Sequence, residues 1–337
     1  MSAAGSSRKV APDEITCGQA TQMALDEALA ADERVLVFGE DVADPEGGGI
    51  VGMTTGLSSK YGARVRSTPI SEQAIAGLAV GAAIAGMRPV AEIMLMNFIT
   101  LAMDQIVNHA AKTRFMSGGK TSVPLTIRTM SGAGLGSGGQ HSDMYEAWFA
   151  HVPGLKVVVP SNPRDQKGLL TSCIFDDDPC IFIETTALTW QKGPRPEPGH
   201  VVPLGEAAVA RPGSDVTLVG YGRPILDALV VAEKLAAEGI SLEVIDLRTV
   251  MPWDEQTVFE SVARTRRAVT LHEAVKQFGP GAEISSRIHE ELFSQLKGPV
   301  IRVASKNSVV PFTPVLEQAF MWSQAEIEAA VRKTLTY

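Results

Sequence analysis

The sequence predicts an α/β fold of two doubly wound domains, each with a parallel sheet covered by helices on both faces. Short runs rich in valine and isoleucine alternate with helical patterns along the chain, which is typical of such sheets. The chain has 337 residues, and roughly 150 residues per domain is the usual size. The segment 191–198 has three prolines in eight residues, so we expect it to begin an extended linker between the domains.

In the first half, a capping box at Thr16 and Gln19 predicts a helix that continues to about Ala31. The other helical patterns lie at 72–85, 98–113 and 162–175. Buried strands are expected at the short apolar runs 34–38, 89–94, 125–129, 156–159 and 180–184.

In the second half the alternation resumes. Strands are expected at 216–219, 242–245, 268–271 and 300–303, and helices near 225–237, 254–263, 282–296 and 324–335. We therefore expect four segments along the chain: a disordered tail at 1–14, a first domain at 15–190, a linker at 191–204 and a smaller second domain at 205–337.

Composition excludes several classes of function. Lysine and arginine number 30 and aspartate and glutamate 38, which gives a net charge of −8. This acidic balance disfavours nucleic acid and anionic membrane surfaces as partners. The longest apolar run, 75–87, is 13 residues, whereas a membrane span needs about 20. Three cysteines without paired spacing indicate a reducing compartment, and residues 1–12 lack a secretory apolar core, so we expect a cytoplasmic protein.

A glycine-rich loop after the strand at 125–129 invites two interpretations. Gly134, Gly136 and Gly139 fit the spacing of a dinucleotide-binding loop. That site also needs an acidic residue at the end of the next strand, but the strand at 156–159 is followed by proline and serine. We therefore favour a loop that brings His141 into a pocket, because its near-neutral pKa suits proton transfer. An ordinary surface histidine is the alternative.

Two glutamates are candidates for chemistry. Glu72 precedes the apolar stretch 74–78, where desolvation would favour proton exchange. The alternative is that Ser71 caps the helix and Glu72 only complements the helix dipole. Glu40 follows the strand at 34–38, and residues at the carboxyl ends of strands in open α/β sheets face the ligand crevice. A loop carboxylate on the surface is the alternative for Glu40.

The order and spacing of short motifs over about 300 residues resemble one known family. The chain is similar to the beta subunit of the thiamine-diphosphate-dependent decarboxylating component of 2-oxo acid dehydrogenase complexes, of pyruvate, acetoin or branched-chain type. The matching stretches are VFGEDV (37–42), TPISE (68–72), GMRPVAE (86–92), MDQIVN (103–108), QHS (140–142), PGLKVV (153–158), KGLL (167–170), GSDVT (213–217), HEA (272–274) and PFTP (311–314).

The resemblance implies a transketolase-like pyrimidine-binding domain followed by a transketolase C-terminal domain. Glu72 matches the glutamate that hydrogen-bonds the pyrimidine nitrogen of thiamine diphosphate, an interaction that favours proton removal from the reactive thiazolium carbon. Phe98 matches the aromatic residue beside the pyrimidine, with plain helix packing as the alternative, and Glu40 is expected to line the same cofactor site. His141 matches a histidine near the reacting carbon that handles the substrate carboxylate and acyl transfer to lipoamide.

The family often has a structural potassium ion, for which oxygen ligands are suitable. The aligned positions are Leu125, Cys173, Ile174, Asp176 and Asp178. Three consecutive aspartates in a loop are equally consistent with a turn at a helix end, so both interpretations stay open.

The resemblance also implies partners. The Gly-Asp-Gly segment that holds the diphosphate and Mg²⁺ in thiamine enzymes does not occur here, and the family places it on a separate alpha subunit. We therefore expect an α2β2 heterotetramer in which each chain supplies half of the active site. The expected substrate is a small 2-oxo acid or acetoin, with the acyl group passing to a lipoyl acyltransferase core.

One departure from the family pattern concerns the substrate. The family usually reads His-Ser-Gln, whereas Asp143 follows Ser142 here. An extra carboxylate beside His141 could raise the pKa of the histidine or repel an anionic substrate. Two other functions therefore stay open: an acyloin-forming α/β enzyme outside a multienzyme complex, and a non-catalytic assembly subunit in which Glu72 is only a helix-end charge.

Overall fold

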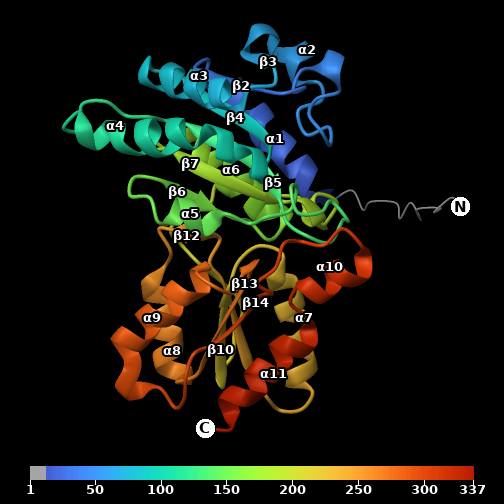
Figure 1. Ribbon diagram of the computed structural model, residues 1–337, viewed down its shortest axis with the longest axis vertical. Coiled ribbons are helices and arrows are strands. Elements are labelled where there is room, and N and C mark those ends of the chain that lie inside the picture. The colour runs from blue at the N-terminus through green and yellow to red at the C-terminus, as the bar shows by residue number, and fades with distance from the viewer. Residues whose placement is uncertain (1–12) are drawn as a thin grey trace, which may run out of the picture.

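A computed structural model describes residues 13–337, in which the strands form two main sheets, one above the other in Figure 1. The larger sheet contains seven strands within these residues. Their order is β12 (Thr249–Met251), β6 (Lys156–Val158), β7 (Cys180–Thr185), β5 (Thr126–Ser131), β4 (Arg88–Leu95), β2 (Val35–Gly39) and β3 (Val65–Ser67). All neighbours in this sheet are parallel except β12 and β6.

Helices cover both faces of the larger sheet. On one face, α1 (Cys17–Ala31) packs against α6 (Pro163–Phe175). The Thr16 hydroxyl accepts the Gln19 N–H, and the Gln19 side chain accepts the Thr16 N–H, so the predicted capping box is confirmed. The other face carries α3 (Glu72–Ile84).

The segment expected as one helix at 98–113 changes its winding twice. It begins as a 3₁₀ helix, η3 (Met96–Ala102), continues as a π-helix, η4 (Gln105–Ala110), and ends as α4 (Ala111–Met116). The prediction of a helical segment is therefore confirmed, but the prediction of one regular α-helix is wrong. Both η3 and η4 pack on α3, and π turns of this kind often occur at functional sites.

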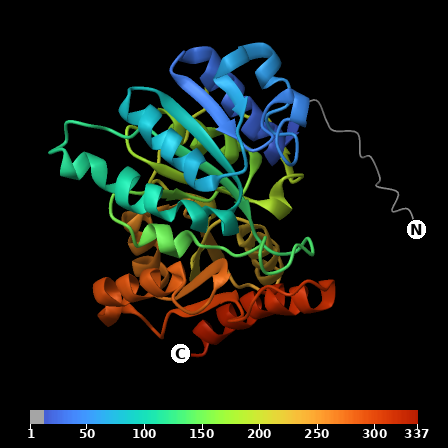
Figure 2. The ribbon, with the colours of Figure 1, turned by 45° about the horizontal axis from the view of Figure 1, so that its top comes forward.

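The smaller sheet contains five of the described strands. Their order is β14 (Ile301–Ser305), β13 (Ala268–Val275), β10 (Val216–Gly220), β11 (Leu242–Asp246) and β9 (Ala208–Arg211), of which only β9 is antiparallel to its neighbour. One face packs on α8 (Glu255–Thr265) and α9 (Pro280–Leu292), and the other on α7 (Pro224–Ala236) and α11 (Gln324–Leu335). The two-sheet, doubly wound α/β fold predicted from the sequence is thus confirmed (Figure 2).

Several short elements were not expected from the sequence. They are η1 (Asp44–Glu46), α2 (Leu57–Tyr61), η2 (Gly62–Arg64), α5 (Glu146–Ala150), η5 (Thr186–Leu188), η6 (Phe293–Gln295) and α10 (Pro314–Phe320). Two further strands, β1 (Glu14–Thr16) and β8 (Lys192–Pro194), form an antiparallel pair, so part of the expected linker lies against the start of the described chain. None of the helices within 13–337 is long and apolar enough to span a membrane.

Two short strands, β1 and β12, lie across boundaries that we expected between segments of the chain. Of the expected tail at 1–14, residues 1–12 lie outside the described residues, and Glu14 begins β1. The edge strand β12 belongs to the second half of the chain, yet it pairs with β6 of the larger sheet.

One apolar core runs through the junction between the two sheets. It contains Phe149 and Val157 from the first half and Tyr221, Ile245 and Ile284 from the second half, all fully or almost fully buried. Because these side chains share one core, the two halves pack as one body rather than as two independent units.

A buried ionic network joins the helices of one face to the larger sheet. The Arg128 guanidinium on β5 pairs with Glu92 on β4 and Glu184 on β7, each at 2.7 Å. Glu184 also accepts hydrogen bonds from Thr21 on α1 at 2.6 Å and from Gln166 on α6 at 2.8 Å. The guanidinium therefore forms ion pairs with two carboxylates inside the protein.

We expect Arg128→Leu to lower the free energy of unfolding by about 3–5 kcal/mol, because two buried carboxylates lose their only basic partner among the described residues. Arg332→Leu removes an exposed arginine from its pairs with Glu238 and Glu328 and should leave the free energy of unfolding nearly unchanged, because exposed ion pairs contribute little to stability. Urea unfolding of the full chain, followed by circular dichroism, measures both. Equal losses in the two variants would contradict the structural role of Arg128.

A second prediction concerns pH. Glu146 on α5 is fully buried and accepts a hydrogen bond from the Tyr221 hydroxyl at 2.8 Å, and burial raises the pKa of Glu146 from 4.5 to about 7. The folded chain thus holds a proton that the unfolded chain releases between these values. The resulting stabilisation is complete below about pH 4.5 and is lost as the pH rises through 7.

Glu146→Gln should therefore reduce the fall in melting temperature between pH 5 and pH 8 relative to the original chain. Some fall should remain, because burial also raises the pKa of Asp246 and Glu273 to about 7. Thermal unfolding followed by circular dichroism at both pH values gives the comparison. A variant with an undiminished fall would show that Glu146 does not hold this proton.

Candidate functional site

The four residues predicted to act in chemistry or cofactor binding come from one edge of the larger sheet. Glu40 follows β2, and Glu72 begins α3 after β3. Phe98 lies in η3 after β4, and His141 lies in the glycine-rich loop after β5. Because β2 to β5 are parallel neighbours in this sheet, their carboxyl ends lie at the same edge, where open α/β sheets bind ligands.

Glu72 and Glu40 form a pair of buried carboxylates at this edge. Each side chain is only 8% exposed, and one Glu40 carboxylate oxygen, Oε1, is buried without a hydrogen-bond partner. Burial raises the pKa of Glu40, and the negative charges of Glu72, Asp41 and Glu92 raise it further. Within residues 13–337 no lysine or arginine forms an ion pair with Glu40 or Glu72. The arrangement favours a ligand that donates a proton or hydrogen bond to these oxygens.

The helix-cap alternative for Glu72 is only partly realised. The Ser71 hydroxyl makes no capping hydrogen bond, although Ser71 occupies the cap position of α3. Glu72 is the first residue of the helix, where the helix dipole favours a negative charge. Complementing the helix dipole does not require burial, yet Glu72 is buried near a second carboxylate, Glu40.

Phe98 and His141 lie together although 43 positions separate them in the sequence. Their ring centroids are 5.5 Å apart, and the ring planes meet at 76°. Both side chains are half-buried. The expected aromatic wall and the expected histidine are thus neighbours, which neither local pattern determined.

The carboxylate of Asp143 is engaged away from His141. It accepts hydrogen bonds from the Asn97 amide at 2.8 Å and from the Tyr145 hydroxyl at 3.0 Å. Burial and the Asp143 charge raise the pKa of Tyr145 to about 12. No ion pair joins Asp143 to His141 in the part of the chain described. The departure from the family pattern therefore serves to fix the loop against η3, through Asn97.

The glycine-rich loop has no free N–H groups at Gly134 and Gly136 to offer a dinucleotide phosphate. The N–H groups of Gly134 and Gly136, which a phosphate would need, donate to the Glu317 carboxylate at 2.7 and 3.0 Å. The next helix, α5, starts only at Glu146 and has five residues. The structure thus favours the loop as the support of His141 over a nicotinamide site.

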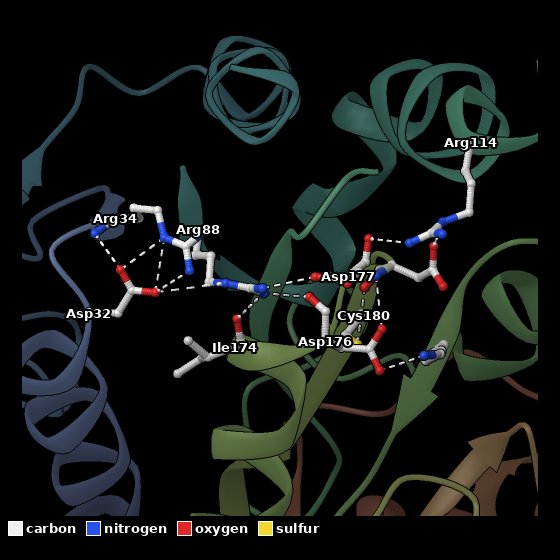
Figure 3. A network of polar contacts seen from close by, with 10 residues as sticks. Asp32, Arg34, Arg88, Arg114, Ile174, Asp176, Asp177 and Cys180 are labelled. Atoms are coloured by element: carbon white, nitrogen blue, oxygen red, sulfur yellow. Dashed lines mark hydrogen bonds and ion pairs between the residues drawn. The ribbon is translucent and has the colours of Figure 1, made fainter. Parts of the chain in front are cut away.

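The residues aligned with the potassium site lie together, but cationic side chains take several of their oxygens (Figure 3). The carboxylate of Asp176 pairs with Lys156 and that of Asp178 with Arg114. Arg88 donates to the carbonyls of Ile174 and Asp176 at 3.3 and 2.9 Å.

The remaining two carbonyls are also engaged. Leu125 accepts the Cys180 N–H at 2.8 Å, and Cys173 accepts the Asp176 N–H at 3.3 Å. Within residues 13–337 no group of three or more histidine, cysteine, aspartate or glutamate side chains could hold a metal ion. With three basic side chains already against these acceptors, the donor set fits a further cation poorly, and the potassium site stays a prediction.

Sequence reasoning missed the residues that hold the loop. These residues reach the loop from elements of the second half, 90 to 183 positions away in the chain: Arg223 at the start of α7, Glu273 on β13 and Glu317 on α10. The only signals were the motifs at 272–274 and 311–314, which carried the resemblance without an assigned role. Contacts over such distances leave no local periodicity that a sequence could show.

Two family models match the chain. The model described as "Transketolase, pyrimidine binding domain" matches residues 13–190, and that described as "Transketolase, C-terminal domain" matches residues 205–327. A solved split-gene transketolase, described as an inactive beta4 tetramer, superimposes with a TM-score of 0.79 at 23% identity, over 96% of this chain and 99% of the other. At this identity the likeness shows the fold.

Curated relatives are considerably more similar. The chain is 44% identical to the beta subunit of acetoin:2,6-dichlorophenolindophenol oxidoreductase from Cupriavidus necator, over 93% of this chain and 95% of the relative. It is 43% identical to the mitochondrial pyruvate dehydrogenase E1 component subunit beta from Dictyostelium discoideum, over 97% of this chain and 93% of the relative. The pyruvate dehydrogenase E1 beta subunit of Rhizobium meliloti is 42% identical over 94% of this chain and 69% of its own length.

Proposed function

We propose that this chain, which belongs to the transketolase-like family of pyruvate and acetoin dehydrogenase E1 beta subunits, is the beta subunit of a thiamine-diphosphate-dependent dehydrogenase. Its substrate would be a small 2-oxo acid or acetoin, the two classes named in its relatives. The observation that carries the proposal is the buried pair of Glu72 and Glu40 beside Phe98 and His141, at the carboxyl edge of a parallel sheet.

The described residues fit the pyrimidine half of thiamine diphosphate. When bound, the cofactor would supply a carbon nucleophile whose activation depends on proton exchange at its pyrimidine ring. Glu72 would hold the proton at the ring nitrogen through its carboxylate. Glu40, with its unpartnered oxygen, would accept a hydrogen bond from the same ligand, and Phe98 would provide an apolar wall beside it.

His141 would act on the substrate side of the site. It lies 5.5 Å from the Phe98 ring, so it can reach the space above the pyrimidine position. A neutral or protonated imidazole there can orient the substrate carboxylate and move a proton during acyl transfer. The engagement of Asp143 by Asn97 and Tyr145 leaves this role to His141.

An alpha subunit would complete the site and would hold the diphosphate and Mg²⁺, because the chain lacks the Gly-Asp-Gly segment. Two apolar side chains next to the site support a covering subunit: Ile70, two positions before Glu72, is 83% exposed, and Leu101 in η3 is 62% exposed. The α2β2 assembly, the lipoyl acyltransferase core and a cytoplasmic location stay predictions.

Glu72→Gln should lower turnover by about 10²–10⁴-fold, because the amide cannot hold the proton in the same way. Turnover of pyruvate and of acetoin is measured with 2,6-dichlorophenolindophenol as electron acceptor, using the chain purified with its partner. Glu326→Gln is the matched control, since Glu326 also lies in the first turn of a helix but is exposed and paired with Lys306.

If Glu72→Gln retained normal turnover in an intact assembly, Glu72 would be a helix-end charge and the assembly function would take precedence. The substrate giving the higher kcat/KM identifies the class. Equal low rates with both would exclude the two substrates named in the relatives.

Native mass spectrometry of the tagged chain from its own source tests the partner. We expect a heterotetramer with a second subunit of similar size that retains thiamine diphosphate and magnesium. A homodimer or monomer without thiamine, reproduced in several gentle preparations, would contradict the half-site proposal.

A further inference from the structure

The loop that carries His141 is held from the other half of the chain by three charged side chains. Arg223 donates to the Ala133 carbonyl at 2.8 Å, and Glu273 accepts the Ala133 N–H at 2.8 Å. Glu317 accepts the N–H groups of Gly134 and Gly136 at 2.7 and 3.0 Å. Every one of these partners in the loop is a backbone group, so the contacts fix the path of the loop itself.

Glu317 accepts two loop N–H groups, whereas Arg223 and Glu273 each make one hydrogen bond with the loop backbone. It lies in the first turn of α10, which sits beside the loop at the junction of the two sheets (Figure 1). Its side chain is 3% exposed, and no lysine or arginine within 13–337 forms an ion pair with it. A buried carboxylate without a cation depends on its hydrogen bonds, and for Glu317 the loop N–H groups supply them.

The loop has little structure of its own to resist displacement. Gly134 and Gly136 have φ values of +109° and +70°, which glycine adopts at little steric cost. A Cβ at Gly138 would come within 2.9 Å of the Phe312 ring, and a Cβ at Gly139 would collide with the Val309 side chain. The path of the loop is therefore set by close packing on the segment 309–312 and by the Glu317 carboxylate.

His141 lies between two held stretches of the loop. On its N-terminal side Glu317 accepts the Gly136 N–H, and the Asn97 amide donates to the Gly139 carbonyl at 3.3 Å. On its C-terminal side Asn97 and Ser131 hold Asp143. Displacement of either stretch would move the imidazole relative to Phe98. Catalytic groups that shift by about 1 Å can lose roughly 10²-fold in rate.

We propose that Glu317 is a positioning residue for His141, through which the second half of the chain sets the geometry of the candidate active site. The proposal rests on the proposed function, because it assigns His141 to the substrate side of that site. The glycine spacing that resembles a phosphate-binding loop thus binds an anion, but the anion is a carboxylate of the same chain.

A double-mutant cycle in the assembled enzyme tests this proposal. Glu317→Gln replaces the carboxylate by an isosteric amide, which retains one acceptor oxygen and presents a donor to the second loop N–H. We expect kcat/KM to fall roughly 10- to 100-fold, with the heterotetramer and its thiamine content unchanged. In a His141→Ala background, the same substitution should cause less than about a twofold further loss, because the residue that it positions is absent.

Equal fold losses in both backgrounds would overturn the proposal, because Glu317 would then act through general stability. Unchanged kcat/KM in the single Glu317→Gln variant would also overturn it, as would full activity of His141→Ala. Failure of the proposed function gives a different result: Glu72→Gln would then retain turnover, whatever the outcome at Glu317. Glu326→Gln, on the next helix, serves again as the control for loss of an exposed carboxylate.

Discussion

The arrangement of this protein depends on the contact between its two sheets. One apolar core continues across the junction. At the same junction, Arg223, Glu273 and Glu317 form hydrogen bonds with backbone groups of the glycine-rich loop that carries His141. Apolar burial supplies most of the favourable free energy of such a junction but does not fix directions. The hydrogen bonds to backbone groups are directional, so they fix the position of the loop and of His141 relative to the two sheets.

The buried carboxylates of the larger sheet fall into two groups, one in ion pairs that hold the structure together and one at the candidate site. Arg128 pairs with Glu92 and Glu184 in the interior, and Glu184 also accepts hydrogen bonds from α1 and α6. At the carboxyl edge Glu40 and Glu72 have no such partner among the described residues, and burial and mutual repulsion raise the pKa of Glu40. The same residue type is thus paired with a guanidinium in one place and buried without a basic partner among the described residues in another.

Much of the fold followed from local patterns. Parallel buried strands are nearly continuous apolar runs, and helices between them show their own period, so the long elements could be placed from the sequence. The π-helical turn at 105–110 was missed because an apolar pattern with helical spacing does not distinguish π from α winding. The strand β12 was missed because three residues carry too little pattern, and its partner β6 lies about ninety positions earlier.

The sequence alone determined the alternation of strands and helices, the positions of Glu40 and Glu72 at strand and helix ends, and the motifs that resemble the family. These are local properties of neighbouring residues. The tertiary structure alone decided that Phe98 and His141 are neighbours, that Asp143 turns to Asn97 and Tyr145, and that Glu317 holds the glycine loop. The physical reason is that most of these contacts join segments far apart in the chain. The pairing of β4 with β5 brings Asn97 and Phe98 to the loop after β5, and the packing of the two sheets brings Glu317 to the same loop.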